Sequence, residues 1–200
     1  AMMFPVRMKS PNLPNPPTRL SNDTCVDYKA RIRTIPDYPA QGIMFRDVTT
    51  LMSDAEAFAA AIEELCRPYE AAGIAKVAGI DARGFILGGA MAVRLGAGFL
   101  PLRKPGKLPY ETWSESYELE YGSDALHMHV DGVSEGEKTL LVDDLIATGG
   151  TAEAGVKLLR RGGADIVAAV FLVDLPDLRG ADRIRKLGIE VRSLIAFEGH

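Results

Sequence analysis

The sequence has few of the residues that mark a secreted, zinc-binding or membrane-spanning protein. Its two cysteines, Cys25 and Cys66, lie far apart and outside any CxxC or Cys/His spacing, so neither a disulfide framework nor a zinc site is expected. No apolar run reaches the roughly 18 to 20 residues of a membrane span, and the first residues lack the apolar core of a secretory signal. The net charge of -4 gives no overall attraction to nucleic acid or anionic lipid. We therefore expect a cytoplasmic protein without a nucleic-acid or membrane partner.

A chain of 200 residues is most simply one domain, and it is long enough to bury a sizeable core. Residues 1–23 contain five prolines and no hydrophobic periodicity, so we expect a flexible N-terminal extension, followed by a single domain over residues 24–200. The extension carries three cations before its first acid, Asp23, which leaves a role in organelle targeting open.

From residue 54 onward, segments with helical periodicity alternate with short apolar runs rich in Val, Ile, Leu and Ala. This alternation predicts an α/β fold, with an open, mainly parallel, twisted sheet flanked by helices on both faces. Between residues 115 and 130, two alternating runs surround Gly-Ser-Asp, which predicts an antiparallel β-ribbon that projects from the sheet. We expect helices at 54–73, 85–96, 151–162 and 177–188, and strands at 76–80, 97–102, 139–143, 164–173 and 189–197.

Three polar segments directly follow predicted strands, namely residues 81–84, 103–107 and 143–151. Ligands of open α/β sheets bind outside the carboxyl ends of the strands. We therefore expect the three segments to line one crevice.

Cations are concentrated in two of these segments. Arg103, Lys104 and Lys107 lie within five residues, and Arg83 adds a fourth cation from the neighbouring unit. Cations gathered at strand ends suit a diphosphate better than a single phosphate. A solvated basic turn is the alternative interpretation.

The segment that runs from Ala147 through Thr148, Gly149 and Gly150 to Thr151, which we call the phosphate loop, leads straight into a predicted helix. Its backbone N–H groups and two hydroxyls can point at one anion at the helix N-terminus. The chain lacks the Gly-Lys-Ser/Thr of a Walker loop and the G-x-G-x-x-G spacing, which disfavours ATP hydrolysis and dinucleotide binding. A bare Gly-Gly turn is often purely structural, but two preceding acids and two flanking threonines favour a phosphate site.

Asp143 and Asp144 precede the phosphate loop by only a few residues, although a carboxylate repels a phosphate. Ionised aspartate only accepts hydrogen bonds, so sugar hydroxyls a few ångströms from a 5′-phosphate are suitable partners. Mg²⁺ shared with a nearby diphosphate would neutralise the remaining charge. The alternative is that both acids only end the strand and cap the next turn.

Five stretches together resemble the type I phosphoribosyltransferase family. LLVDDLIATGGT (140–151) is similar to its motif for phosphoribosyl diphosphate, whereas the other four are similar to the adenine branch. These four are GIMFRDVT (42–49), ARGF (82–85), RKPGKLP (103–109) and SYELEYGSDALHMH (116–129). The resemblance covers about residues 26–198. It implies a homodimer that transfers the 5-phosphoribosyl group from phosphoribosyl diphosphate to adenine in purine salvage, giving AMP and diphosphate with Mg²⁺.

The resemblance also implies roles for single residues. Asp143 and Asp144 would hold the ribose 2′ and 3′ hydroxyls, the phosphate loop would bind the 5′-phosphate, and Mg²⁺ would be held mainly through the substrate. The implied diphosphate ligands are Arg83, Arg103, Lys104 and Lys107. The implied catalytic residues are Arg83, Glu120 and Tyr121. The peptide bond between Ala82 and Arg83 is a candidate for a cis non-proline bond, which no sequence signal marks.

The implied adenine site is the run Met44, Phe45 and Arg46. Phe45 would stack on the purine, while Arg46 and the backbone of Met44 would meet its polar edge. From the residues alone, an aromatic ring beside an arginine in a Gly-rich loop suits a flat heteroaromatic ligand. A lone phenylalanine, however, is more often part of a core.

The ribbon at 110–130 is suitably placed to act as a mobile lid. Displacement of diphosphate from C1′ passes through an oxocarbenium-like transition state, and water competes with the purine unless a lid closes. By resemblance, Glu120 and Tyr121 swing in, with Glu120 near N7 of the purine as proton donor or acceptor. An exposed charge on a mobile ribbon is the alternative for Glu120. We expect His127 and His129 to face solvent rather than to bind a metal.

Two other functions remain open. The first is a phosphoribosyltransferase for another base, such as xanthine or guanine, against which the intact GIMFRD and LEYG strings argue. The second is a regulator that senses phosphoribosyl diphosphate. Such a regulator would carry a nucleic-acid-binding domain, for which a 23-residue extension is too short.

Overall fold

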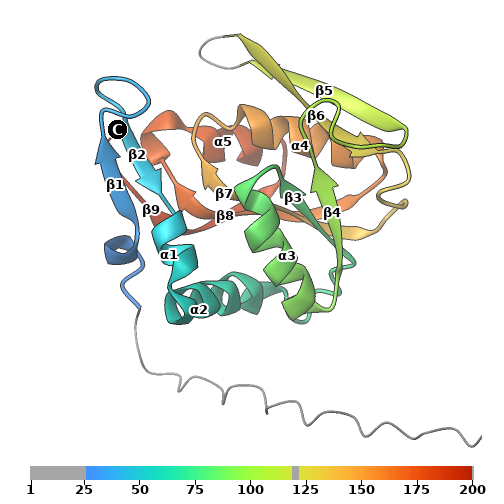
Figure 1. The fold of residues 1–200 in the computed structure, drawn as a ribbon. Helices are drawn as coiled ribbons and strands as arrows, with labels where there is room; N and C mark the ends of the chain where they lie inside the picture. Colours follow the sequence, from blue (N-terminus) through green and yellow to red (C-terminus); the bar gives the residue numbers. More distant parts are fainter. Residues whose placement is uncertain (1–25, 119–121, 200) are drawn as a thin grey trace, which may run out of the picture.

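A five-stranded parallel sheet forms the centre of the molecule in this computed structural model, which describes residues 26–118 and 122–199 (Figure 1). The predicted extension 1–23 and two predicted catalytic residues, Glu120 and Tyr121, lie outside the described residues. The strand order is β4-β3-β7-β8-β9, and all four pairings are parallel. The strands are β3 (Lys76–Ile80), β4 (Gly98–Leu102), β7 (Lys138–Ile146), β8 (Asp165–Asp174) and β9 (Glu190–Ala196). The predicted α/β class is confirmed.

Helices cover both faces of the sheet, as the apolar strands require. Helices α1 (Thr49–Ser53), α2 (Ala55–Cys66) and α3 (Arg83–Leu95) lie on one face, and α4 (Gly150–Arg161) and α5 (Gly180–Arg185) lie on the other (Figure 1). Successive strand residues alternate between two buried clusters, so that Val77 faces α2 and α3 while Ala78 faces α4. The sheet is thus the partition between two hydrophobic cores.

The first long helix is shorter than its periodicity predicts. Asp54 caps α2 as expected, since its carboxylate accepts hydrogen bonds from the N–H groups of Glu56 and Ala57 at 3.2 and 3.1 Å. The helix ends at Cys66, and a 3-10 turn, η2 (Arg67–Tyr69), follows it. Pro68 has no backbone N–H to donate to the preceding turn, which ends the α-helical bonding although Arg67 before it keeps α-helical dihedral angles.

Two antiparallel pairs stand beside the sheet. The hairpin of β1 (Arg33–Pro36) and β2 (Met44–Asp47) follows a 3-10 turn, η1 (Lys29–Arg31), and β5 (Thr112–Glu118) pairs with β6 (Ser123–His129). The second pair is the predicted ribbon, which begins a few residues earlier than its alternation indicates. Its Leu126 and Met128 are fully buried, so the arms of the ribbon are part of the second core.

The last predicted helix is also broken. A 3-10 turn, η3 (Pro176–Leu178), comes first, and α5 begins only after Arg179, whose backbone is left-handed with a φ of 56°. Helical spacing alone did not reveal this break. None of the helices within residues 26–118 and 122–199 combines the length and the apolar character that a membrane span needs.

Candidate functional site

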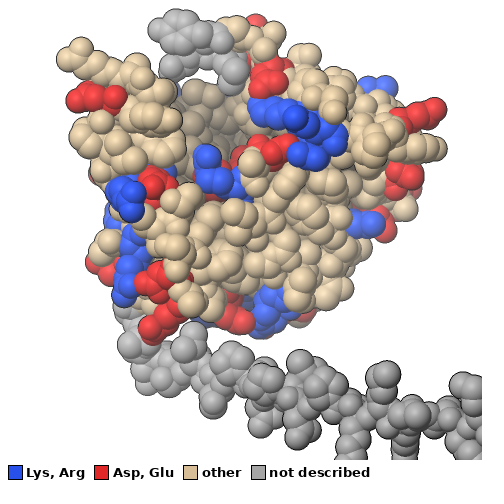
Figure 2. Space-filling model, viewed as in Figure 1, with Lys and Arg blue, Asp and Glu red and all other residues tan. Residues whose placement is uncertain are grey.

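The carboxyl ends of β3, β4 and β7 bring the three predicted segments together at one edge of the sheet. β3 and β7 are neighbours, and the chain continues from β3 to β4 on one side and from β7 to β8 on the other. Such a reversal of strand order is where open α/β sheets bind ligands. Figure 2 shows a recess between the β1–β2 hairpin and the β5–β6 ribbon, with side chains of both charge signs around it. The predicted common crevice is therefore present.

Asp143 and Asp144 lie within β7, which continues to Ile146, rather than after the strand as the apolar run suggested. Asp144 is only 5% exposed, and its carboxylate accepts a hydrogen bond from Nε of Arg83 at 2.6 Å. Its backbone N–H donates to Oδ1 of Asp143 at 2.8 Å. Burial, and next the charge of Asp144, raise the pKa of Asp143 well above its usual range. The acids thus have unequal surroundings, and Asp144 has the cationic partner.

The phosphate loop connects β7 to α4. Gly149 has a φ of 79°, which an L-residue adopts only under strain, and Gly150 is the first residue of α4. The leading N–H groups of the helix therefore belong to this loop, while Thr148 is exposed.

The phosphate loop rests against the start of α5. A Cβ added to Gly149 would lie 2.8 Å from the carbonyl oxygen of Gly180, and one added to Gly180 would lie 2.7 Å from the nitrogen of Gly149. Two backbones meet here without room for a methyl group. Gly180 thus supports the loop from behind, a role that nothing in the sequence around it indicates.

The predicted diphosphate cations all lie at this edge, but most already have partners. Nε of Arg103 donates to Asp81 at 3.0 Å, and its Nη1 donates to the carbonyl of Lys107 at 3.2 Å. Lys104 donates to Asp124 of the ribbon and to the hydroxyl of Tyr117. Burial opposes the charge of Lys104, but these two bonds outweigh it and raise its pKa.

Lys107 differs from the other predicted cations, because its side chain is exposed and makes no ion pair within the described residues. To bind an anion, Arg103 and Lys104 would exchange their present hydrogen-bond partners for it. Lys107 has no such ion pair to give up.

The cis non-proline bond lies one position before the predicted one. It joins Asp81 to Ala82, and Arg83 is already the first residue of α3. The bond between Ala82 and Arg83 has the ordinary trans form, so the predicted position was wrong by one residue.

The predicted base site is a strand rather than a Gly-rich loop, because Met44, Phe45 and Arg46 form most of β2. The Phe45 ring meets the Tyr38 ring edge to face at 5.1 Å. The guanidinium of Arg46 turns toward the C-terminal end of the chain.

Three contacts fix Arg46 there. It lies 4.3 Å from the centre of the Phe197 ring and donates hydrogen bonds to Thr34 at 2.6 Å and to the carbonyl of Gly199 at 3.2 Å. Its buried Nε has no hydrogen-bond partner within the described residues. The side chain therefore orders the hairpin, and a contact of Arg46 with the purine stays a prediction.

The two histidines of the ribbon are half-buried rather than solvent-facing, so that part of the prediction was wrong. Nδ1 of His127 lies 3.1 Å from the hydroxyl of Thr112, and its main chain pairs with Arg103. The ring of His129 meets the ring of Tyr110 edge to face at 6.2 Å, so side chains of the same ribbon and of the segment before it partly cover both histidines. No group of three potential metal ligands occurs within residues 26–118 and 122–199.

The comparisons with known proteins agree with this geometry. The model of the phosphoribosyl transferase domain matches residues 51–197. The chain therefore belongs to the phosphoribosyltransferase family. A curated relative, the adenine phosphoribosyltransferase of Bradyrhizobium sp. (strain ORS 278), is 63% identical over 175 residues, which are 88% of this chain and 98% of the relative. Within the family, the chain thus groups with the adenine phosphoribosyltransferases.

Solved structures give the same result. The adenine phosphoribosyltransferase of Rhodothermus marinus is 47% identical, with a TM-score of 0.79 over 85% of this chain and 96% of that chain. The enzyme of Saccharomyces cerevisiae, complexed with an imino-altritol bisphosphate and adenine, is 33% identical, with a TM-score of 0.78 over 84% of this chain and 96% of that chain.

Proposed function

We infer that the protein transfers the 5-phosphoribosyl group from phosphoribosyl diphosphate to adenine, giving AMP and diphosphate, as a step of purine salvage. One observation carries this conclusion. Two adjacent carboxylates near the end of β7 are followed, a few residues later, by a phosphate loop that leads into α4, which is the order that a ribose and its 5′-phosphate suit. The high identity to adenine phosphoribosyltransferases supports adenine as the base rather than xanthine or guanine.

Each cluster has one task in this proposal. The phosphate loop binds the 5′-phosphate, and Asp143 and Asp144 accept hydrogen bonds from the ribose hydroxyls. Arg83, Arg103, Lys104 and Lys107 receive the diphosphate as its bond to C1′ breaks. Arg83 connects the proposed diphosphate site to the proposed ribose site, because it contacts Asp144 from the start of α3.

Mg²⁺ is the cofactor that these residues suit. Mg²⁺ keeps several waters and binds through one or two carboxylates together with substrate phosphates. Asp143 and Asp144 provide such carboxylates, and the described residues offer no larger ligand group. We propose that the ion is held mainly by the ribose and diphosphate oxygens, whose charge it neutralises.

The arms of the ribbon limit the movement of the proposed lid. Lys157 of α4 lies 3.3 Å from Glu115, and Arg161 stacks on Trp113 at 5.3 Å. These contacts and the buried Leu126 hold the arms on α4. We propose that these arms stay on α4 when the lid closes, and that Glu120 and Tyr121 have the catalytic roles that the family resemblance implies.

Asp144→Asn is expected to weaken the binding of phosphoribosyl diphosphate by about 10- to 100-fold, since a hydrogen bond to a charged group contributes about 1.5–3 kcal/mol. The substitution keeps the shape of the side chain but removes its charge and its attraction for Arg83. Isothermal titration calorimetry with Mg²⁺ measures the effect. Asp165→Asn, at the exposed opposite end of the sheet, is the control. An unchanged affinity of Asp144→Asn for phosphoribosyl diphosphate would show that Asp144 does not contact the ribose.

Phe197→Ala is expected to raise the KM for adenine about two- to fivefold and to leave the KM for phosphoribosyl diphosphate unchanged. A cation–π contact at a partly exposed site contributes about 0.5–1 kcal/mol, and its loss frees Arg46 and thereby loosens β2. Steady-state kinetics with each substrate varied separates the two constants. Glu198→Gln, an exposed neighbour, should leave both constants unchanged, and a rise in both for Phe197→Ala would indicate a general loss of structure.

A homodimer is the assembly that we propose. Ile86 and Val93 lie seven residues apart on α3, hence on one face, and are 50% and 84% exposed. Exposed apolar side chains on one helix face favour burial against a second copy.

Val93→Glu is therefore expected to shift the protein from dimer to monomer at micromolar concentration. Its side chain makes few contacts within the chain, so the fold should persist. Sedimentation velocity measures the assembly, and Ala59→Glu, an exposed position of α2, is the matched control. A monomeric control or a dimeric Val93→Glu would contradict this interface.

A reducing cytoplasm is the location that we propose. Cys66 is a free, buried cysteine, and burial raises the pKa of its thiol to about 11. Such a thiol is inert at neutral pH and needs no oxidising compartment.

A further inference from the structure

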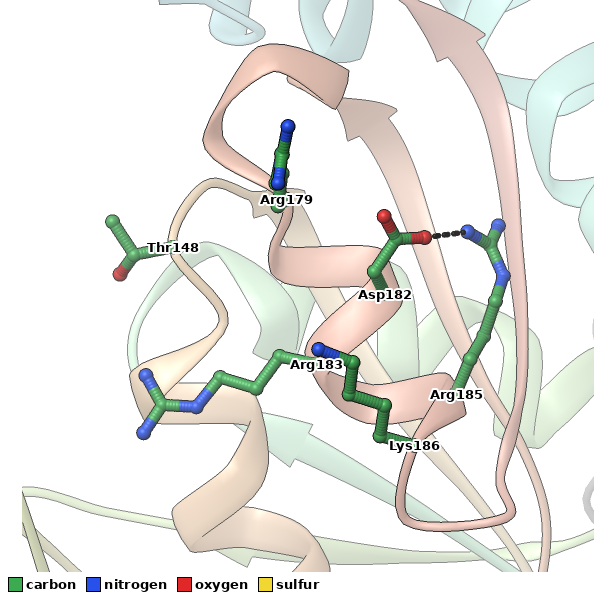
Figure 3. A pocket seen from close by; sticks show the side chains of 6 residues that line it. All are labelled: Thr148, Arg179, Asp182, Arg183, Arg185 and Lys186. Atoms are coloured by element: carbon green, nitrogen blue, oxygen red, sulfur yellow. Dashed lines mark hydrogen bonds and ion pairs between the residues drawn. The ribbon is translucent and has the colours of Figure 1, made fainter.

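A second basic recess lies between the phosphate loop and α5 (Figure 3). It has a volume of about 650 Å³, and one wall is Thr148 of the loop. The other wall is the segment that turns from η3 into α5. The lining side chains of that segment are Arg179, Asp182, Arg183, Arg185 and Lys186. None of the cations proposed to bind diphosphate lines this recess, although its Thr148 also belongs to the phosphate loop.

The recess carries an excess of positive charge. Two of its four cations are neutralised, because Arg183 pairs with Glu153 of α4 and Arg185 pairs with Asp182 at 3.0 Å. Arg179 and Lys186 are exposed and make no ion pair within the described residues. Two unpaired cations beside two exchangeable guanidinium groups attract an anion with several charges.

The backbone conformation of Arg179 positions one of these unpaired cations. Arg179 has a left-handed backbone with a φ of 56°, which is strained in an L-residue. This conformation ends η3 and starts α5, and it brings Arg179 to the rim beside Thr148. A glycine at this position would avoid the strain but would also remove the guanidinium.

The recess and the phosphate loop share structural parts. Thr148 belongs to both, and Gly180, the residue after Arg179, touches the backbone of Gly149 without room for a methyl group. An anion held by Arg179 would therefore lie beside the same loop that is proposed to bind the 5′-phosphate. The two anions would repel each other because both are negatively charged. A displacement of α5 would also displace the phosphate loop, because the two backbones are in contact.

We propose that this recess binds an oligophosphate, either inorganic or the phosphate tail of a nucleotide, and that the bound anion weakens the binding of phosphoribosyl diphosphate. The volume exceeds that of one phosphate group, and guanidinium groups bind phosphate oxygens in pairs. The binding site itself is independent of the proposed function, whereas its effect on the substrate rests on that function.

Calorimetric titration of the full chain with inorganic tripolyphosphate tests the site. We expect two tripolyphosphate ions per chain, one in the crevice and one in the recess. The double variant Arg179→Gln/Lys186→Gln should bind one ion, with affinity for the second reduced at least tenfold. Arg67→Gln/Arg192→Gln, which removes two exposed cations elsewhere, should still bind two. In the absence of oligophosphate, all three proteins should have equal turnover.

Competition between tripolyphosphate and phosphoribosyl diphosphate tests the proposed effect on the substrate. Phosphoribosyl diphosphate should displace only one of the two ions from the wild type, and tripolyphosphate should raise the KM for this substrate more in the wild type than in Arg179→Gln/Lys186→Gln. Tighter binding of ATP than of tripolyphosphate would identify a nucleotide as the natural ligand. Equal binding of the two would identify an inorganic oligophosphate. A single ion that phosphoribosyl diphosphate displaces completely would overturn the proposal, while normal AMP formation would leave the proposed function intact.

Discussion

Gly180→Ala is expected to weaken the binding of phosphoribosyl diphosphate by about 10- to 100-fold, although Gly180 touches no substrate in this account. The added Cβ would lie 2.7 Å from the nitrogen of Gly149 and even closer to the carbonyl oxygen of Ala147. Both neighbours are backbone atoms, so no side-chain rotation relieves the overlap and the phosphate loop must move. A displaced loop loses one or more charge-assisted hydrogen bonds, which contribute about 1.5–3 kcal/mol each.

The measurement is calorimetric binding of phosphoribosyl diphosphate, with circular dichroism to show that Gly180→Ala folds. Gly89→Ala is the matched control, because a Cβ at Gly89 meets nothing within 4 Å. That substitution lies inside α3 and should stabilise the protein slightly. A folded Gly180→Ala protein with wild-type affinity would show that the contact between α5 and the loop does not position the phosphate site.

Glu120→Gln is expected to slow turnover by about 10²- to 10⁴-fold, which is the usual contribution of a general acid or base. The amide keeps the size of the side chain but can neither give nor take the purine proton. The affinity for phosphoribosyl diphosphate should remain nearly unchanged, since the proposed partner of Glu120 is N7 of the base. Single-turnover kinetics separates this chemical step from product release.

Glu118→Gln is the control for this experiment. Glu118 is exposed near the end of β5, and its carbonyl oxygen lies close to Gly150 of the phosphate loop. A general loss of negative charge on the ribbon would affect both variants alike. Wild-type turnover in Glu120→Gln would remove this residue from the mechanism.

Local patterns predicted the elements of the fold well, because alternation and periodicity depend on neighbouring residues. The strand at 76–80 was predicted to the residue, and the α4 and β8 ranges shifted by one. Predictions were less accurate where one residue interrupts a pattern. Pro68 ends α2 early, and the left-handed Arg179 divides the last predicted helix. In β7 the sheet pairing continues through Asp143, so the strand extends beyond its apolar run.

The three polar segments lie at one edge of the sheet as predicted, but the partners of their residues and of Arg46 were not foreseen. Arg83 finds Asp144 at a separation of 61 residues, and Arg46 finds Gly199 at 153. Such pairs depend on the strand order, which no local pattern in the chain encodes. Gly180 is a further example, because its only signal is a glycine that directly follows Arg179. Its importance follows from a backbone approach that exists only in three dimensions.

The most direct test of the proposed function is to supply the full chain with Mg²⁺, phosphoribosyl diphosphate and each purine base in turn, and to identify the nucleotide formed. We predict AMP from adenine, with diphosphate released in equal amount, and no nucleotide from guanine, hypoxanthine or xanthine. A different nucleotide would contradict the assignment of the base, and retained binding of phosphoribosyl diphosphate without any product would favour a sensor over an enzyme.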